Sequence, residues 1–140
     1  MLYLIGFMGV GKTTIGKQLA LQHNINFIDT DKEIEITTNK SILNIFQQDG
    51  KNHFRKLEST TLKTISKNHV VACGGGLPIY NNNIDFIKKS GVSIYLKASE
   101  GEIFIRLSNN SKIRPLVQNK SDKDLKSFIK KTLAEREKFY

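Results

Sequence analysis

The chain has 140 residues, of which 39% are hydrophobic and 25% are charged, and its formal net charge is +9. This length and composition predict one folded domain over residues 1–140 and exclude a disordered protein. No apolar run approaches the roughly 20 residues that span a bilayer, and the opening apolar run is too short for a signal peptide. We therefore expect a cytoplasmic protein that does not bind membranes.

In chain order, the hydrophobic pattern predicts a buried strand at 1–5, a helix at 12–22 and a second strand at 25–28. A helix opens at Ser41 as its N-cap and is interrupted by Gly50, and a longer helix follows through 54–65. A third strand at 70–73 precedes a helix at 81–90 that ends at Gly91. A fourth strand at 92–96 and a helix at 99–107 lead into a polar segment, 108–121, which we predict to be a mobile lid before a final helix at 122–140.

Strands that alternate with helices are typical of a parallel sheet with helices on both faces. The predicted fold class is therefore a three-layer α/β/α fold with a central parallel sheet. In such sheets, ligands gather at the carboxyl ends of the strands. The polar motifs of this chain follow the predicted strands or lie in the loops beside them.

The segment from Gly6 to Thr13 matches the pattern G-x-x-x-x-G-K-[ST] in full and lies between a predicted strand and a predicted helix. Its backbone N–H groups would cradle phosphate, Lys12 would neutralise the β- and γ-phosphates, and the Thr13 hydroxyl would bind Mg²⁺. The alternative is a glycine-rich turn that only caps a helix. The predicted ATP-binding residues of this segment are Gly9, Val10, Gly11, Lys12, Thr13 and Thr14.

Two acids, Asp29 and Asp31, follow the second predicted strand. A carboxylate at a strand end can hold a magnesium-bound water or accept a proton from an attacking hydroxyl. An aspartate is also a common helix N-cap, and the residues alone leave both interpretations open.

Several further polar groups have a functional and a plainer interpretation. Arg55 and Glu58 share a helical face, either as an arginine held to grip a carboxylate or as a surface ion pair. The triplet Gly74–Gly76 is a backbone nest or tight approach site, or a flexible turn. Arg114 in the lid can close over phosphates, and Arg136 lies on the last helix; each is otherwise a solvated arginine.

The one cysteine, Cys73, excludes an intrachain disulfide and is predicted to be a small buried residue rather than a reactive thiol. The three histidines are far apart and lack metal-site spacing. The basic charge fits anionic small molecules, and no run of five or six basic residues marks a nucleic-acid site.

Taken together, these motifs resemble the shikimate kinase family over the whole chain. The segments that carry the resemblance are GFMGVGKTT at 6–14, FIDTD at 27–31, SILNIFQQDG at 41–50, FRKLE at 54–58, CGGG at 73–76, IRPL at 113–116 and the arginine before Tyr140. The phosphate-binding motif is shared with many kinases, whereas the other motifs in this order are far more specific.

The resemblance implies transfer of the ATP γ-phosphoryl group to the 3-hydroxyl of shikimate, which gives shikimate 3-phosphate and ADP in aromatic amino acid biosynthesis. It implies Mg²⁺ as cofactor, held by Thr13 with Asp29 nearby through water. Asp31 would bind the substrate hydroxyls and act as the base, with Lys12 and Arg114 as further catalytic residues. We expect a monomer that binds shikimate and ATP and no nucleic acid.

For the substrate, the resemblance implies that the carboxylate is gripped by Arg55, Gly75 and Arg136, with Gly76 beside them. A small hydroxylated anion is suited to guanidinium groups at one end and a carboxylate at the other. For the nucleotide, the resemblance implies that Arg114 reaches the ATP phosphates from the lid and that Arg106 stacks near the adenine.

The chain departs from the family pattern at its C-terminal end. It stops at Tyr140, where the resemblance implies a tail of roughly a few tens of residues more that supplies an edge strand, part of the adenine pocket and a closing helix. The family's proline shortly after the last arginine is replaced in Arg136-Glu137-Lys138.

Three other functions remain as alternatives. One is another small-molecule kinase with the same phosphate-binding loop, acting on gluconate or a nucleoside monophosphate. Another is a catalytically weak nucleotide-binding remnant, for which the short C-terminal end is the only support. The third is nucleic-acid binding through the basic surface, which would be sensitive to salt.

Overall fold

A computed structural model of the chain describes residues 1–109, 117 and 120–140. Its strands are β1 (Leu2–Ile5), β2 (Asn26–Asp29), β3 (His69–Ala72) and β4 (Val92–Tyr95). Its helices are α1 (Lys12–Gln22), α2 (Thr30–Thr38), α3 (Ile42–Gln48), α4 (Gly50–Thr64), α5 (Asn83–Ser90), α6 (Glu100–Ser108) and α7 (Asp122–Glu137), with a short 3₁₀ helix η1 (Leu77–Ile79). No helix in the described ranges is long and apolar enough to cross a membrane.

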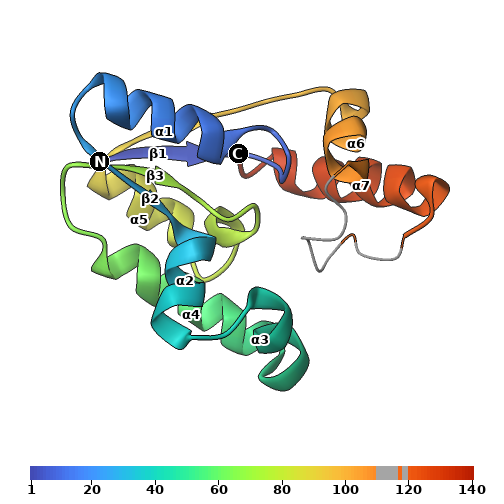
Figure 1. The fold of residues 1–140 in the computed structure, drawn as a ribbon, viewed down its shortest axis with the longest axis horizontal. Coiled ribbons are helices and arrows are strands. Elements are labelled where there is room, and N and C mark those ends of the chain that lie inside the picture. The colour runs from blue at the N-terminus through green and yellow to red at the C-terminus, as the bar shows by residue number, and fades with distance from the viewer. Residues whose placement is uncertain (110–116, 118–119) are drawn as a thin grey trace.

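The four strands form one parallel sheet in the order β2-β3-β1-β4. Because side chains alternate along a strand, the two faces of β1 pack on different helices. Leu4 and Val70 on one face pack against Ala20 of α1. The opposite face packs against α4 and α5 through Tyr3, Ile5, Val71, Leu62 and Ile87. The predicted three-layer α/β/α fold with a parallel sheet is confirmed (Figure 1).

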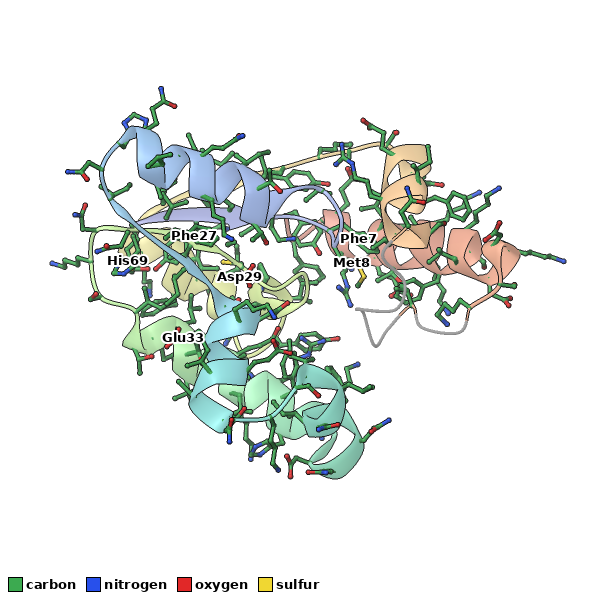
Figure 2. The ribbon with its side chains drawn as sticks, viewed as in Figure 1. Phe7, Met8, Phe27, Asp29, Glu33 and His69 are labelled. Carbon is green, nitrogen blue, oxygen red and sulfur yellow. The ribbon has the colours of Figure 1, made fainter. Side chains whose placement is uncertain are left out.

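Two helical groups extend from the carboxyl edge of the sheet (Figure 1). Helices α2, α3 and α4 share a cluster around Ile34, Ile45 and Phe54. Helices α6 and α7 form a second group, and Phe7 and Met8 of the loop after β1 pack into it, as Figure 2 shows. One cleft is lined by residues of both groups and by the segments that follow β1, β2 and β3.

The observed helices differ from the predicted ones at three places. Helix α5 starts at Asn83 rather than 81, because Asn81 and Asn82 adopt positive φ angles of 54° and 55°. Helix α7 ends at Glu137, three residues before the predicted end. Helix α2 was not predicted; Asp29 caps it. Most of the predicted lid, including 110–116, lies outside the described residues.

Candidate active site

The loop between β1 and α1 surrounds the ammonium group of Lys12. Gly9 and Gly11 have φ angles of 84° and 101°, in the region that favours glycine, so the backbone can turn tightly before α1 begins. The buried Lys12 donates hydrogen bonds through Nζ to the carbonyl oxygens of Gly6 at 2.8 Å and Phe7 at 2.9 Å. A positive charge is therefore fixed beside the N-terminus of α1, where helix N–H groups favour anions.

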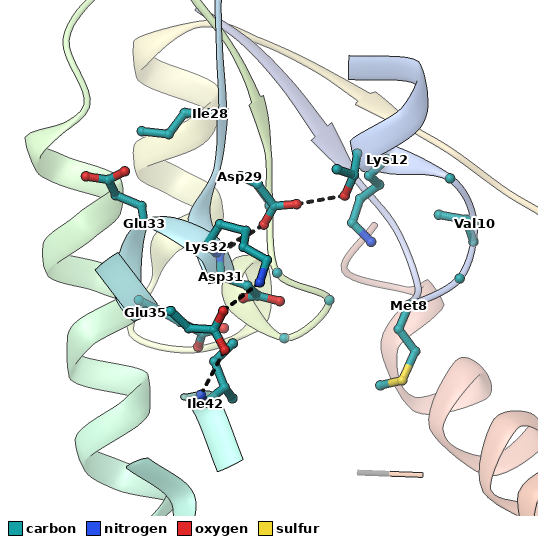
Figure 3. A pocket seen from close by; sticks show the side chains of 18 of the residues that line it. Met8, Val10, Lys12, Ile28, Asp29, Asp31, Lys32, Glu33, Glu35 and Ile42 are labelled. Carbon is teal, nitrogen blue, oxygen red and sulfur yellow. Dashed lines mark hydrogen bonds and ion pairs between the residues drawn. The ribbon is translucent and has the colours of Figure 1, made fainter. Parts of the chain in front are cut away.

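The carboxylate of Asp29 has two different roles, one for each oxygen. Oδ1 accepts hydrogen bonds from the N–H groups of Asp31 at 3.1 Å and Lys32 at 3.4 Å, which caps α2. Oδ2 accepts a hydrogen bond from the Thr13 hydroxyl at 2.7 Å. The sequence left a helix cap and a functional acid as alternatives, and this geometry accommodates both (Figure 3).

Thr30, between the two acids, is a residue that the sequence analysis did not single out. Its side chain is fully buried, and its hydroxyl accepts a hydrogen bond from the Gly74 N–H at 2.8 Å. The same hydroxyl donates to the Ala72 carbonyl at 3.4 Å. Thr30 thus ties the segment that carries Asp31 to the glycine triplet after β3. No local sequence signal marks it, because its partners are more than forty residues away.

Arg55 and Glu58 form a buried ion pair rather than a surface one. The Arg55 Nη1 atom lies 2.6 Å from Glu58 Oε2, and the side chains are 9% and 1% exposed. The guanidinium carbon of Arg55 lies 4.3 Å from the centre of the Tyr80 ring, which holds the group from a second side. Burial raises the pKa of Glu58 to about 7, although the Arg55 charge opposes the rise.

The glycine triplet allows charged side chains to approach the backbone closely. A Cβ atom at Gly76 would lie 2.5 Å from Arg55 Nη1, and one at Gly74 would lie 2.5 Å from Asp31 Oδ1. A Cβ atom at Gly75 would lie 3.6 Å from Arg136 Nη1. These three glycines, all of them described, do not adopt positive φ angles. Close approach, rather than backbone conformation, therefore accounts for glycine at positions 74 and 76.

The remaining predicted arginines fall at three different places. Arg106 of α6 donates a hydrogen bond to the Gly9 carbonyl at 3.1 Å, so it lies at the edge of the phosphate-binding loop. Arg136, in the last turn of α7, reaches the glycine triplet. Arg114 lies outside the described residues, and its role stays a prediction.

Cys73 lies immediately before the triplet but is only 1% exposed, among apolar side chains of the core. Burial raises the pKa of its thiol to about 12, so the thiol stays protonated at neutral pH. This environment agrees with the interpretation of Cys73 as a small buried residue.

One cleft of about 1040 Å³ joins these groups. Its walls include all the predicted site residues that the structure describes: Gly9, Val10, Gly11, Lys12, Thr13, Thr14, Asp29, Asp31, Arg55, Gly75, Gly76, Arg106 and Arg136. Figure 3 shows Asp29 directed toward the start of α1, with Asp31 next to it in the same cleft. The cleft thus has a phosphate-binding end and an end with an acid and two guanidinium groups.

Comparison with known proteins agrees with this arrangement. The family model described as Shikimate kinase matches residues 8–140. The chain is 42% identical over 142 residues to a shikimate kinase of Azobacteroides pseudotrichonymphae, which covers 99% of this chain and 84% of the relative. A crystal structure of shikimate kinase from Bacteroides thetaiotaomicron superposes with a TM-score of 0.94 at 36% identity, over 99% of this chain and 80% of that one.

A second solved structure, shikimate kinase from Acinetobacter baumannii in complex with shikimate, is 33% identical and has a TM-score of 0.91. It covers 99% of this chain and 76% of that chain. Sequence and structure thus match the same family over nearly the full length of the chain, and we conclude that the chain belongs to the shikimate kinase family.

Proposed function

We propose that this chain transfers the γ-phosphoryl group of ATP to the 3-hydroxyl of shikimate, which gives shikimate 3-phosphate and ADP. The observation that carries the proposal is the approach of Asp31, Arg55 and Arg136 to one glycine triplet, in the cleft that also contains the phosphate-binding loop. Membership of the family and the shikimate complex of the Acinetobacter baumannii relative support the same substrate.

At the phosphate end, the loop and the first turn of α1 would bind ATP through residues 9–14. The Lys12 ammonium group, held near the loop carbonyls, would stabilise the charge that spreads over the transferred phosphoryl oxygens. Arg106, at the edge of the loop, would lie beside the nucleotide. Catalysis in this arrangement depends on positioning and charge stabilisation.

Mg²⁺ fits the oxygen groups at the start of α1 and α2. The Thr13 hydroxyl and the Asp29 Oδ2 atom lie 2.7 Å apart, and both are hard oxygen ligands of the kind that Mg²⁺ takes. In the described part of the chain, no group of three or more His, Cys, Asp or Glu residues could hold a metal by itself. Thr13 would bind the ion directly and Asp29 through water, and the ion, when bound, neutralises charge on the phosphates.

At the substrate end, the guanidinium groups of Arg55 and Arg136 would bind the shikimate carboxylate next to the glycine triplet. Arginine suits this role because its planar fork can donate two hydrogen bonds to one carboxylate. Asp31 would accept hydrogen bonds from the substrate hydroxyls and take the proton from the 3-hydroxyl as it attacks. Lys12 and Asp31 line the same cleft, so the phosphoryl donor and the acceptor hydroxyl would meet in it.

Replacing Gly76 with alanine is expected to raise the KM for shikimate by roughly ten- to a hundredfold with little change in the KM for ATP. The added Cβ atom would lie 2.5 Å from Arg55 Nη1, and Glu58 and Tyr80 hold that guanidinium group in place, so it must leave its position. Steady-state kinetics with each substrate varied would measure the effect.

The matched control for this substitution is Gly101→Ala in α6. A Cβ atom at Gly101 would meet no heavy atom within 4 Å, so both KM values should stay near those of the unchanged chain. Alanine is also a better helix former than glycine, so this variant should be no less stable. If Gly76→Ala bound shikimate as tightly as the unchanged chain, the close packing of Arg55 on the triplet would not be the reason why position 76 requires glycine.

We also propose that the enzyme acts as a cytoplasmic monomer. One chain supplies every predicted site residue that the structure describes, so this part of the site needs no residue from a second subunit. ATP, the phosphoryl donor, is a cytoplasmic metabolite.

The test of this function is ADP release by the 140-residue chain with MgATP, in the presence and absence of shikimate. We expect release that depends on shikimate, and a phosphorylated product whose phosphate is on the 3-hydroxyl by NMR. Gluconate and nucleoside monophosphates serve as competing acceptors. Faster phosphoryl transfer to one of these acceptors than to shikimate would contradict the proposal. The same holds if ATP binds but shikimate does not increase the release of ADP.

A further inference from the structure

Tyr140 makes a contact with the glycine triplet that the family-based assignment of site residues does not include. Its hydroxyl donates a hydrogen bond of 2.5 Å to the carbonyl oxygen of Gly75. Its ring packs on the ring of Tyr95, the last residue of β4, with the ring centres 5.3 Å apart. Burial raises the pKa of the Tyr140 hydroxyl, while the Arg136 guanidinium beside it opposes the rise, so the hydroxyl stays a hydrogen-bond donor at neutral pH.

The chain reaches this position through a turn at the end of α7. The N–H groups of Phe139 and Tyr140 donate to the carbonyl oxygens of Arg136 at 2.9 Å and Glu137 at 3.1 Å, which directs Tyr140 back toward the sheet. Glu137 accepts a hydrogen bond from the Tyr95 hydroxyl at 3.4 Å and forms an ion pair with Lys97. The last turn of α7 is therefore attached to the end of β4 and to the loop after β3.

This attachment matters because α7 packs mainly on α6, away from the sheet (Figure 1). Arg136 lies in the last turn of α7, whereas Arg55 belongs to α4 and the triplet follows β3, and all of these residues line the same cleft. Tyr140, four residues after Arg136, contacts Gly75 directly, so it can influence where the Arg136 guanidinium lies relative to Gly75.

The hydrogen bond adds a restraint at the middle of the triplet, whose two flanking glycines are held by Thr30, Leu77 and Ile79. Three consecutive glycines have the greatest conformational freedom that a chain can have, and no side chain of their own restrains them. Because a peptide unit is planar and trans, fixing the Gly75 carbonyl also fixes the direction of the Gly76 N–H on its opposite side. A donor on Tyr140 can therefore orient backbone groups at the position where the substrate carboxylate is expected.

We propose that Tyr140 is a positioning residue that holds the Gly75 peptide against Arg136, so that the substrate carboxylate meets both in one geometry. The inference rests on the proposed function, since it concerns the carboxylate end of the same site. Tyr140 acts through Gly75 and Arg136 and need not touch the substrate.

The test is the Tyr140→Phe variant of the 140-residue chain, which keeps the ring on Tyr95 and removes only the hydroxyl. We expect the Kd for shikimate, measured by calorimetry, to rise roughly three- to tenfold, as loss of one hydrogen bond predicts. The Kd for MgATP and the kcat at saturating shikimate should change less than about twofold, because the phosphate end is not altered.

The methyl ester of shikimate separates a positioning role from a general loss of structure. The ester lacks the negative charge that Arg136 would grip, so its weaker binding should be equal for Tyr140→Phe and the unchanged chain. Tyr3→Phe is the matched control, because the Tyr3 hydroxyl forms a hydrogen bond with the Ser90 hydroxyl at 2.8 Å and Tyr3 does not line the cleft. Its loss should leave the Kd for shikimate unchanged.

The outcomes distinguish this inference from the function on which it rests. If the unchanged chain does not bind shikimate, the proposed function fails. If the unchanged chain binds shikimate and Tyr140→Phe binds it equally well, the positioning role of Tyr140 is wrong. It is also wrong if Tyr140→Phe loses as much affinity for the methyl ester as it loses for shikimate. A loss confined to the charged substrate supports it.

Discussion

Asp31→Asn is expected to lower kcat by roughly 10²- to 10⁴-fold, the usual contribution of a general base, while the Kd for MgATP stays near its original value. Asparagine has nearly the size of aspartate and can still bind hydroxyls, but it cannot take the proton of the attacking 3-hydroxyl. The acid lies in the first turn of α2, next to Gly74 and in the cleft with Lys12. Single-turnover kinetics with bound shikimate would measure the chemical step itself.

Asp85→Asn provides the matched control for this prediction. Asp85 also lies in the first turn of a helix, α5, but it is exposed and does not line the cleft. The same substitution there changes the interaction with the helix dipole, worth roughly 0.3–1 kcal/mol, without touching the site. Near-full turnover by Asp31→Asn with shikimate bound would exclude a proton-accepting role for Asp31 and leave it only a binding role.

The sheet and the phosphate-binding loop could be predicted because local patterns determine them. Residues 1–5 and 70–73 are apolar runs bounded by glycine, and buried parallel strands have this pattern. Helix α2 has no comparable pattern. Of its nine residues only Thr30 and Ile34 are buried, and its threonines and isoleucines are weak helix formers. Its cap, Asp29, and its contacts with α4 stabilise it instead.

Motifs indicated the candidate site residues, but they did not predict the contacts that arrange these residues. The spacing of Arg55 and Glu58 predicts that they meet on one helical face, yet their burial follows from the packing of α4 under the glycine triplet. Thr30 and Tyr140 act through hydroxyl groups on partners 44 and 65 residues away. A contact of that range leaves no periodic signal in one sequence, so only the folded chain reveals it.

Glu58→Gln is expected to remove a large pH dependence from the free energy of unfolding. The ion pair with Arg55 at 2.6 Å by itself lowers the pKa of Glu58, but burial outweighs it and raises the pKa to about 7. The carboxyl has its ordinary pKa of about 4.5 in the unfolded chain, so between pH 4.5 and 7 the folded chain binds more protons. Its contribution to stability is full below pH 4.5 and is lost as the pH rises toward 7.

Between pH 4.5 and pH 7, the free energy of unfolding of the unchanged chain should fall by about 3 kcal/mol relative to that of Glu58→Gln. Urea titrations at several pH values between 4.5 and 8 would measure it. Carboxylates whose pKa is lowered, such as Glu35, act in the opposite direction, but they are present in both chains and cancel in the difference. Glu35→Gln is the control of opposite sign, because the stability that Glu35 contributes is lost as the pH falls.

The same titration should appear in substrate binding, because Glu58 and the shikimate carboxylate would share Arg55. Asp31, Arg55 and Arg136 are the charged groups around Glu58, and only the arginines favour its ionised form. As the pH rises through 7, a second negative charge develops next to the incoming carboxylate, so the KM for shikimate should rise in the unchanged chain. Glu58→Gln carries no such charge, and its KM should stay level across this range. Parallel KM profiles in the two chains would show that Glu58 does not titrate in the site.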